Sequence, residues 1–272
     1  MDDGNKAVQG ESWPAALARR LRAGERIADA QFDQLFTAQT RSVSFRHWTP
    51  ISVATRAACF LAEGGATEIL DVGSGPGKVC LVGALRTGAR FTGVEQRQRL
   101  VEEAHVAAVE LGADRARFVH ANLVEFDCSP FDGFYFYNPF QEHIEEDDLW
   151  PIDETIQRAP ELHRTYVGTV VDALIRAPVG TLVATFHGFG APMPREYRRL
   201  RREQICGGEL ALWVRGGSSQ APRRRPEGSR PGELHSDEPS AAGPNPNPET
   251  KEPSLSGDVE PPLLRSSDGH QG

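Results

Sequence analysis

Features that define several large classes of protein are missing from this sequence of 272 residues. No apolar run approaches the roughly 18 residues of a membrane-spanning helix. The first residues, Met-Asp-Asp-Gly, lack the basic and then apolar stretch of a secretory leader. The cysteines stand too far apart to form the close pairs of a metal site; they are Cys59, Cys80, Cys128 and Cys206. We therefore expect a soluble, cytoplasmic protein with reduced thiols, no metal and no membrane partner.

Net positive charge is missing as well. The formal charge is −8, of which residues 216–272 contribute −3 through 6 basic and 9 acidic side chains, which leaves −5 on the rest. Nucleic-acid binding needs cations opposite the phosphates. The charge therefore argues against nucleic acid as a partner, and we interpret the run Arg223–Arg225 as a solvated one.

Aromatic residues are absent from the last 57 residues, which hold 10 of the 20 prolines and 8 of the 27 glycines. Such a segment cannot bury enough apolar area to offset the entropy lost on ordering. We predict a disordered tail over residues 216–272. The remaining part, about 215 residues, suits one α/β domain. We divide it into a helical N-terminal cap, residues 1–48, and a main domain, residues 49–215.

The main domain is organised around a strand, a glycine turn and a helix. Residues 68–72 read as a buried strand, and apolar residues then recur at helical spacing. Gly73, Gly75 and Gly77 separate the two patterns. Glycine permits positive φ, and the helix start behind the turn presents unpaired N–H groups and the positive end of a dipole. This turn is predicted to hold a ligand with polar or anionic groups.

The spacing of the turn separates three ligand classes. A nucleotide P-loop would need glycine where Val72 stands and a hydroxyl where Val79 stands, so it is excluded. The dinucleotide fingerprint begins well, but its third glycine falls on Lys78, which weakens that alternative without excluding it. The motif Asp71-x-Gly73-x-Gly75-x-Gly77 resembles the first motif of the class I S-adenosylmethionine-dependent methyltransferases.

Further strands and helices alternate after this turn. Strands are predicted near residues 90–95, 117–120, 131–138 and 180–187, with helices over 97–111 and 161–177. Residues 195–202 read as a basic helix, and residues 204–215 as a hairpin turning at Gly207-Gly208. A hairpin after five β/α units is typical of the family. The resemblance implies a doubly wound, mostly parallel seven-stranded α/β sheet with a C-terminal antiparallel hairpin and an N-terminal helical extension.

Candidate cofactor residues follow from the resemblance and from position. Asp71 and the three glycines are expected to hold S-adenosylmethionine. Glu95 ends the second strand, where a carboxylate can accept both ribose hydroxyls of an adenosine cofactor. Asn122 follows the third strand, where the family commonly places the acid that receives the adenine amino group; the alternative is a turn asparagine bonded to its own backbone.

The segment before the first strand offers two more candidates. Thr49 is predicted to cap a helix whose first residue is Pro50. In the family such a helix often covers the methionine end of the cofactor, which makes His47 and Trp48 candidates for lining the pocket. A tryptophan before a helix also serves as a packing residue.

The fourth strand ends in Asn138-Pro139-Phe140, which is predicted to emerge beside the transferable methyl group. It resembles a shortened Asn-Pro-Pro-Tyr/Phe signature of amino-group methyltransferases, with one proline missing. The missing residue leaves the position of Phe140 open, and adenine is not carried over as the substrate. A weaker resemblance, over residues 70–140, is to the non-SET histone lysine methyltransferases. A plain turn at the end of the strand remains an alternative.

Seven acids crowd residues 141–154, at the sheet edge where ligands bind in open α/β folds. An acidic mouth would attract a cationic acceptor, although a solvated loop is the alternative. His143 is a candidate proton acceptor. We expect methyl transfer to an amine-type acceptor, a protein side chain or small cation, with Asn138, Phe140 and His143 as catalytic residues. A nicotinamide-dependent oxidoreductase and a catalytically silent S-adenosylmethionine-binding module remain alternatives, and nothing in the sequence indicates an oligomeric state.

Overall fold

The computed structural model describes residues 10–144 and 151–217. The predicted tail, apart from its first two residues, lies outside the described residues, as do four acids of the segment 141–154. One seven-stranded sheet forms the centre of the described part, in the order β3-β2-β1-β4-β5-β7-β6. The strands are β1 Glu68–Val72, β2 Arg90–Glu95, β3 Ala116–His120, β4 Gly133–Tyr137, β5 Leu182–Phe186, β6 Tyr197–Ile205 and β7 Gly208–Arg215.

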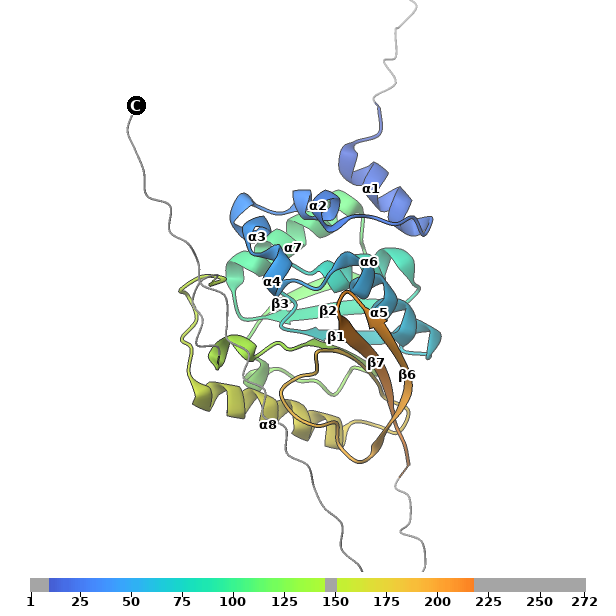
Figure 1. The fold of residues 1–272 in the computed structure, drawn as a ribbon. Helices are drawn as coiled ribbons and strands as arrows, with labels where there is room; N and C mark the ends of the chain where they lie inside the picture. The colour runs from blue at the N-terminus through green and yellow to red at the C-terminus, as the bar shows by residue number, and fades with distance from the viewer. Residues whose placement is uncertain (1–9, 145–150, 218–272) are drawn as a thin grey trace, which may run out of the picture. The chain divides into compact units, whose positions relative to one another are not determined.

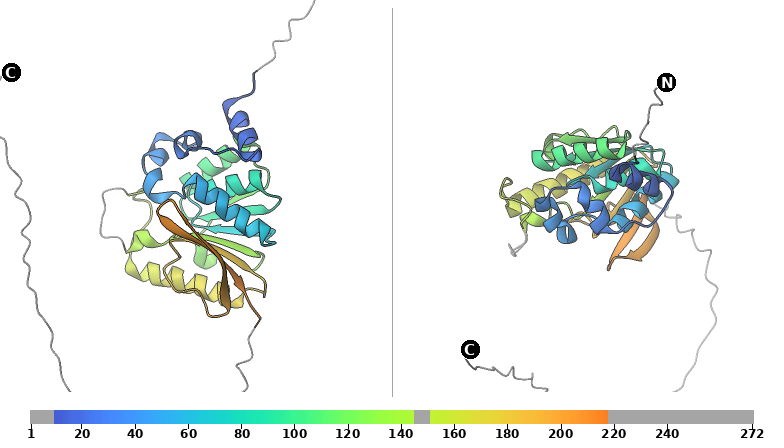
Figure 2. Two further views of the ribbon diagram at one scale, coloured as in Figure 1. Left: turned by 45° about the vertical axis from the view of Figure 1, so that its right-hand side comes forward. Right: turned by 90° about the horizontal axis from the view of Figure 1, so that it is seen from above.

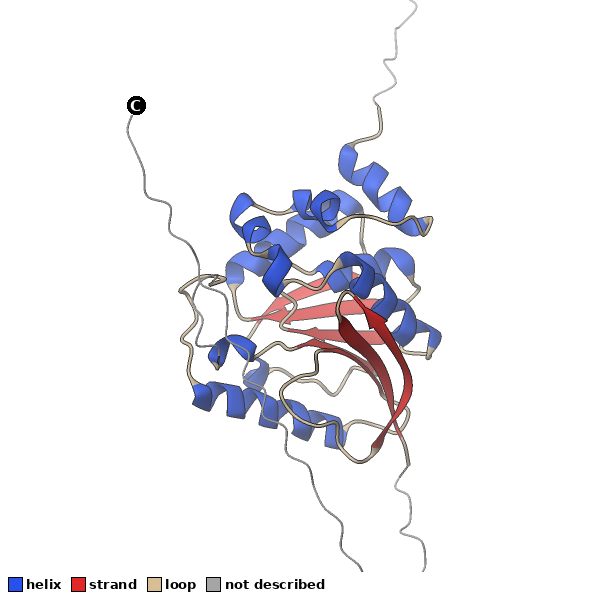
Figure 3. Ribbon diagram, viewed as in Figure 1, coloured by secondary structure: helices blue, strands red, loops and turns tan. Residues whose placement is uncertain are grey.

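Helices precede, link and cover the strands (Figure 3). The α-helices are α1 Trp13–Arg22, α2 Asp29–Phe32, α3 Ala38–Ser42, α4 Ser44–His47, α5 Ile51–Glu63, α6 Lys78–Arg86, α7 Gln98–Leu111 and α8 Pro160–Arg176. Short 3-10 helices are η1 Asp33–Leu35, η2 Leu123–Glu125 and η3 Gln141–His143. In the described ranges, no helix has both the length and the apolar character needed to cross a membrane.

The sheet is buried on both faces. Alternate side chains along β1 point in opposite directions, so Ile69 joins the core beneath α5, α6 and α7, whereas Leu70 joins the core beneath α8. Figure 1 shows the two layers of helices on opposite sides of the strands. This arrangement explains why the strands read as continuous apolar runs rather than as alternating ones.

The topology fixes where a ligand can bind. Strands β1 to β5 are parallel, and the chain runs outward from β1 through β2 to β3 before it returns to β4, beside β1. Strand β7 then runs antiparallel to β5 and pairs with β6. The predicted doubly wound sheet with its terminal hairpin is therefore confirmed. In such sheets the crevice lies where the strand order reverses, here between the carboxyl ends of β1 and β4.

Two predictions about the C-terminal hairpin were wrong. Residues 195–202 are not a helix, because most of them belong to the edge strand β6, whose exposed arginines give no apolar alternation. The ladder with β7 makes this segment a strand. The hairpin turns at Cys206-Gly207, not at Gly207-Gly208, and both turn residues have positive φ, +49° and +76°.

The predicted cap at Thr49, with Pro50 as the first residue of the helix, was also wrong. Helix α5 begins at Ile51, with Pro50 as its N-cap. The Thr49 hydroxyl lies 3.1 Å from the Tyr135 hydroxyl, and the Ile51 N–H donates to Asp29 Oδ1 at 2.9 Å. The Asp29 carboxylate on α2 thus caps α5, in place of the Thr49 side chain that the sequence predicted for this role.

The N-terminal helices lie on the α5–α7 side of the sheet, opposite α8 (Figure 2). Leu17 and Phe32 belong to the same core as α6 and α7. Lys78, in the first turn of α6, is 2% exposed, and its ammonium lies 2.5 Å from Asp29 Oδ1 and 2.9 Å from Asp33 Oδ1. The side chain that occupies the third position of the dinucleotide fingerprint therefore ties the N-terminal helices to the glycine turn.

Candidate active site

The glycine turn after β1 has no room for larger residues. Gly73, Gly75 and Gly77 have φ values of +69°, +54° and +85°. A Cβ atom at Gly73 would lie 2.9 Å from Pro139, and one at Gly75 would lie 2.8 Å from the Trp48 ring. At Gly77 it would lie 2.4 Å from the Phe118 ring. The three glycines are thus required both by backbone conformation and by close packing.

Glu95 points back to this turn from the end of β2. Its Oε2 accepts a hydrogen bond from the Gly75 N–H at 3.1 Å, and its Oε1 accepts one from the Arg97 N–H at 2.9 Å. Burial raises the pKa of this carboxyl, while the N–H groups and the Arg97 charge oppose the rise. An ionised carboxylate offers about four acceptor positions. Each oxygen of Glu95 therefore retains capacity for a ligand hydroxyl.

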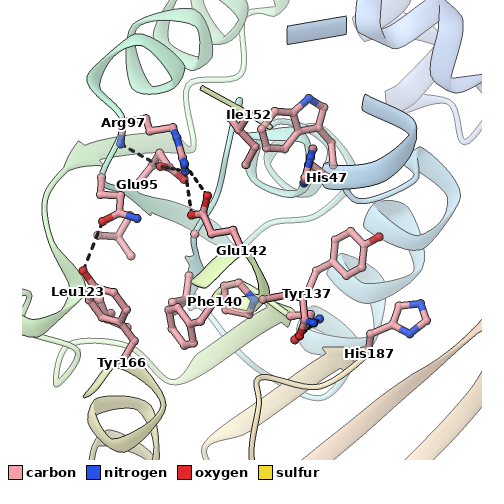
Figure 4. A pocket seen from close by; sticks show the side chains of 18 of the residues that line it. His47, Glu95, Arg97, Leu123, Tyr137, Phe140, Glu142, Ile152, Tyr166 and His187 are labelled. Carbon is pink, nitrogen blue, oxygen red and sulfur yellow. Dashed lines mark hydrogen bonds and ion pairs between the residues drawn. The ribbon is translucent and has the colours of Figure 1, made fainter. Parts of the chain in front are cut away.

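A cavity of about 290 Å³ opens above the strand ends, close to the lower size of small-molecule sites. Its lining comes from the carboxyl ends of β1, β2, β4 and β5, from the segments after β3 and β4, from α8 and from the N-terminal helices. In Figure 4, Glu95 and Arg97 lie on one side of it, and Tyr137 and His187 lie on the other. The topological crevice and the predicted cofactor carboxylate thus coincide.

Two aromatic side chains from the segment before α5 line the cavity. Both His47 and Trp48 face it, as predicted for one of the two alternatives. Trp48 is 7% exposed, its indole N–H donates to the Thr40 carbonyl at 2.9 Å, and its ring lies over Gly75. Trp48 is consequently both a packing residue and a wall of the cavity.

Asp71 lies beneath the turn rather than in the main cavity. It lines a second hollow of about 30 Å³, together with Gly73, Tyr135 and other residues. Burial raises its pKa to about 7, partly offset by a weak hydrogen bond from the Cys80 thiol at 3.7 Å. Asp71 therefore supports the turn from below in this structure, and direct contact with a cofactor remains a prediction.

The side chain of Asn122 is occupied by protein groups. Its Oδ1 accepts from the Val124 N–H at 3.0 Å, and its Nδ2 donates to the Tyr166 hydroxyl at 2.9 Å. This is the backbone-bonded turn asparagine of the alternative interpretation. Tyr166, which lines the cavity, also donates to Gln96 Oε1 at 3.4 Å. Polar groups at this end of the cavity are thus supplied by Gln96 and Tyr166, and an adenine contact of Asn122 stays a prediction.

The residues predicted for catalysis have different locations. Asn138 lines the cavity with a positive φ of +42°, and its N–H donates to the Gly188 carbonyl at 2.9 Å. Phe140 also lines it and stacks on Tyr166, with ring centroids 5.3 Å apart. His143 is 4% exposed, burial lowers its pKa, and among the described residues its Nδ1 has no hydrogen-bond partner. His143 is therefore buried outside the cavity and is not one of the lining residues.

Two described acids of the segment 141–154 are paired with Arg97. Glu142 forms two hydrogen bonds with the Arg97 guanidinium, at 2.5 and 3.1 Å, and Asp153 accepts a third at 3.0 Å. Their charge is therefore shared with a buried cation. Glu154 is exposed, and Glu145 and its acidic neighbours through Asp148 lie outside the described residues. The expected acidic mouth therefore stays a prediction.

Several lining residues were missed by the sequence reasoning. Tyr137 and His187 stand at the ends of β4 and β5, with ring centroids 5.8 Å apart. His187 has a φ of +59°, unusual for a residue other than glycine. Arg97 follows the strand-end acid by two residues. His187 could have been predicted as a lining residue, because it is a polar residue at the end of a parallel strand. No local pattern in the sequence indicated the partners of Arg97.

Residues 69–159 match a family model described as a methyltransferase domain. This segment of the chain carries a methyltransferase domain. The resemblance indicated by the glycine motif is thereby confirmed, and with it S-adenosylmethionine as the cofactor of the class. A comparison with curated protein sequences found no significant match.

Solved structures similar to this methyltransferase domain include enzymes with different acceptors. An RNA methyltransferase from Salinibacter ruber is 23% identical, with 62% of this chain and 93% of that chain covered and a TM-score of 0.44. An O-methyltransferase from Bacillus cereus is 11% identical, with coverages of 74% and 98% and a TM-score of 0.47. An rRNA methylase from Streptococcus thermophilus is 12% identical, with coverages of 60% and 95% and a TM-score of 0.42.

Proposed function

We propose that the protein transfers the methyl group of S-adenosylmethionine to an amine-type acceptor, a protein side chain or a small cationic molecule. The observation that carries this proposal is the Glu95 carboxylate, hydrogen-bonded to the glycine turn and facing a cavity of suitable size. Its remaining acceptor positions suit two ribose hydroxyls. A cofactor held there would extend across Gly73 toward the ends of β4 and β5.

Methyl transfer requires mainly that the acceptor atom and the methyl group be held in line at close range. An acceptor nitrogen attacks the methyl carbon with its lone pair, the carbon–sulfur bond breaks in line, and the sulfonium becomes a neutral thioether while the nitrogen releases a proton. Asn138 and Phe140 both line the cavity, and in this proposal Asn138 orients the acceptor through its side-chain oxygen while Phe140 shapes the wall. His187 is better placed than the buried His143 to receive the proton, because it lines the cavity.

Cofactor binding tests the first part of the proposal. Calorimetric titration with S-adenosylhomocysteine should show binding, and Glu95→Ala should weaken it by roughly 1–3 kcal/mol through the loss of charge-assisted hydrogen bonds. Glu102→Ala, an exposed position on α7, is the matched control and should leave the dissociation constant unchanged. Binding of NADH without binding of S-adenosylhomocysteine would instead favour an oxidoreductase.

Acceptor identity needs a second experiment. The protein is incubated with a cell lysate and S-adenosylmethionine labelled in its methyl group, and the labelled products are identified by mass spectrometry. A methylated protein amine or small cationic amine supports the proposal. A methylated hydroxyl group or nucleobase would overturn the acceptor class while leaving methyl transfer intact, and tight binding without any labelled product would favour a silent binding module.

A further inference from the structure

Arg97 is the most deeply buried arginine that faces the cavity, with 4% of its surface exposed. It occupies the N-cap position of α7, two residues after Glu95. Its guanidinium contacts Glu142 through two nitrogens and Asp153 through the third. The same group lies 3.9 Å from Glu95 Oε1. One cation therefore serves three carboxylates, one from β2 and two from the segment between β4 and α8.

The balance of charge around Glu95 is negative without this arginine. The Glu95 charge raises the pKa of Asp71 on β1. The Glu142 charge, on η3, raises the pKa of Glu95. Arg46 and His47 lie elsewhere in the cavity lining, and Asp153 and its partner Arg99 lie behind Arg97. Among these described groups, Arg97 is the only cation with a recorded ion pair to Glu95.

Two contacts of different kinds join Arg97 to Glu95. Its backbone N–H donates to Oε1 and fixes where that oxygen points, and this contact is independent of the Arg97 side chain. The guanidinium adds a positive charge, which favours the ionised carboxylate in a buried site. A protonated carboxyl would lose acceptor capacity, and a ribose that donates two hydroxyl hydrogens would then be bound less well.

We propose that Arg97 is a positioning residue that presents Glu95 as a charged hydrogen-bond acceptor to the cofactor ribose. This inference rests on the proposed function. Glu142 has an effect on the Glu95 pKa opposite to that of Arg97, because its negative charge raises that pKa. The same carboxylate also holds the Arg97 guanidinium in place. The pair Arg97–Glu142 thereby links the cofactor carboxylate to the segment that begins with Asn138.

The pH dependence of cofactor affinity tests this assignment without any acceptor. The dissociation constant of S-adenosylhomocysteine is measured by calorimetry from about pH 5 to pH 9. In the native protein burial raises the Glu95 pKa and Arg97 opposes that rise, so affinity should fall as the pH drops and the carboxyl takes up a proton. Arg97→Met should raise that pKa and move the midpoint of the affinity loss upward by about one pH unit or more, since a nearby opposite charge lowers a carboxyl pKa by about 1–3 units.

Three further variants separate charge from structure. Arg97→Lys keeps the positive charge and should leave the midpoint near its native position. Loss of the planar guanidinium, with its several hydrogen-bond donors, would weaken binding equally at every pH. Glu142→Gln should move the midpoint downward, opposite to Arg97→Met. Arg164→Met, an exposed arginine on α8 paired with Glu161, is the matched control and should shift nothing.

A merely structural role for Arg97 predicts a different pattern. It would weaken binding equally at all pH values and leave every midpoint unchanged, and that result would overturn the inference while leaving the proposed cofactor intact. If Arg97→Met does not fold, the unchanged midpoint of Arg97→Lys together with the lowered midpoint of Glu142→Gln still decides. Failure of the native protein to bind S-adenosylhomocysteine at any pH would overturn the proposed function itself, and this inference with it.

Discussion

The two ends of the cavity are built in different ways. At the β1 and β2 end, Gly75 and Glu95 are held by a mutual hydrogen bond, and Arg97 is buried beside them. At the β4 and β5 end, Asn138 is half-buried, His187 is exposed, and both have left-handed backbone conformations. The first end is held rigid by a backbone hydrogen bond and buried charge, which suits the proposed binding of one constant cofactor. The second end presents accessible side chains, and we infer that acceptor choice resides there.

The strongest test of this contrast is Gly77→Ala at the cofactor end. The new Cβ would lie 2.4 Å from the Phe118 ring at a φ of +85°. Left-handed strain of about 1–2 kcal/mol and overpacking of about 1–3 kcal/mol should together lower the free energy of unfolding in urea by roughly 2–5 kcal/mol. Gly112→Ala, also left-handed but with no atom nearer than 3.7 Å, is the control and should cost only the strain. Equal losses in the two variants would contradict the packing argument.

Asp71→Asn tests the buried charge under the same turn. The folded protein holds the Asp71 proton up to about pH 7, whereas the unfolded chain releases it near its ordinary pKa of 3.8. The folded state binds more protons in this interval, so the native protein loses stability as pH rises from about 4 to about 7. Asparagine cannot ionise. The variant should gain on the native protein by an amount on the order of 3 kcal/mol between pH 4 and pH 8, measured by urea unfolding. A pH-independent difference would show that Asp71 does not titrate there.

Asn138→Ala sharpens the contrast from the acceptor end. It should leave the dissociation constant of S-adenosylhomocysteine nearly unchanged and lower turnover by about 10- to 100-fold, or roughly 1.4–2.7 kcal/mol, because it removes an orienting oxygen. Labelled product formed in the lysate reports turnover. Asn138→Gly tolerates the φ of +42° and separates lost chemistry from backbone strain. Full turnover in the glycine variant would remove the amide from the mechanism.

The smallest effect is expected from Trp48→Phe. The ring over Gly75 is largely kept, but the indole N–H bond to the Thr40 carbonyl is lost. Stability measured by urea unfolding should fall by about 1–2 kcal/mol, the cost of an unsatisfied buried acceptor. The affinity for S-adenosylhomocysteine should change little, and a large loss would show that the indole itself binds the cofactor.

The cofactor end could be predicted because its signals are local. Gly73, Gly75 and Gly77 stand at fixed spacing between a strand and a helix, and Glu95 ends the next strand. Each requirement there, positive φ or a carboxylate at a strand end, is met by residues close together in the sequence. The hairpin was also predictable from a local pattern, whereas the mostly parallel sheet was predicted from the resemblance that the glycine motif indicated.

The remaining features depend on partners distant in the sequence. Arg97 pairs with Glu142 and Asp153, 45 and 56 residues away, and no sequence pattern announces such a cluster. His143 lies in an acidic segment of the sequence but is buried, because Tyr166 on α8 packs against it with ring centroids 5.4 Å apart. The edge strand β6 carries exposed arginines, so only its ladder with β7 distinguishes it from a helix.

The indole of Trp48 stands over the glycine turn, at the wall of the main cavity. Its fluorescence therefore samples the space that an adenosyl ligand would occupy. Trp13 and Trp213, which do not line that cavity, would contribute background emission. If those two and Trp150 were replaced by phenylalanine, the fluorescence of Trp48 alone would report whether a ligand occupies the cavity.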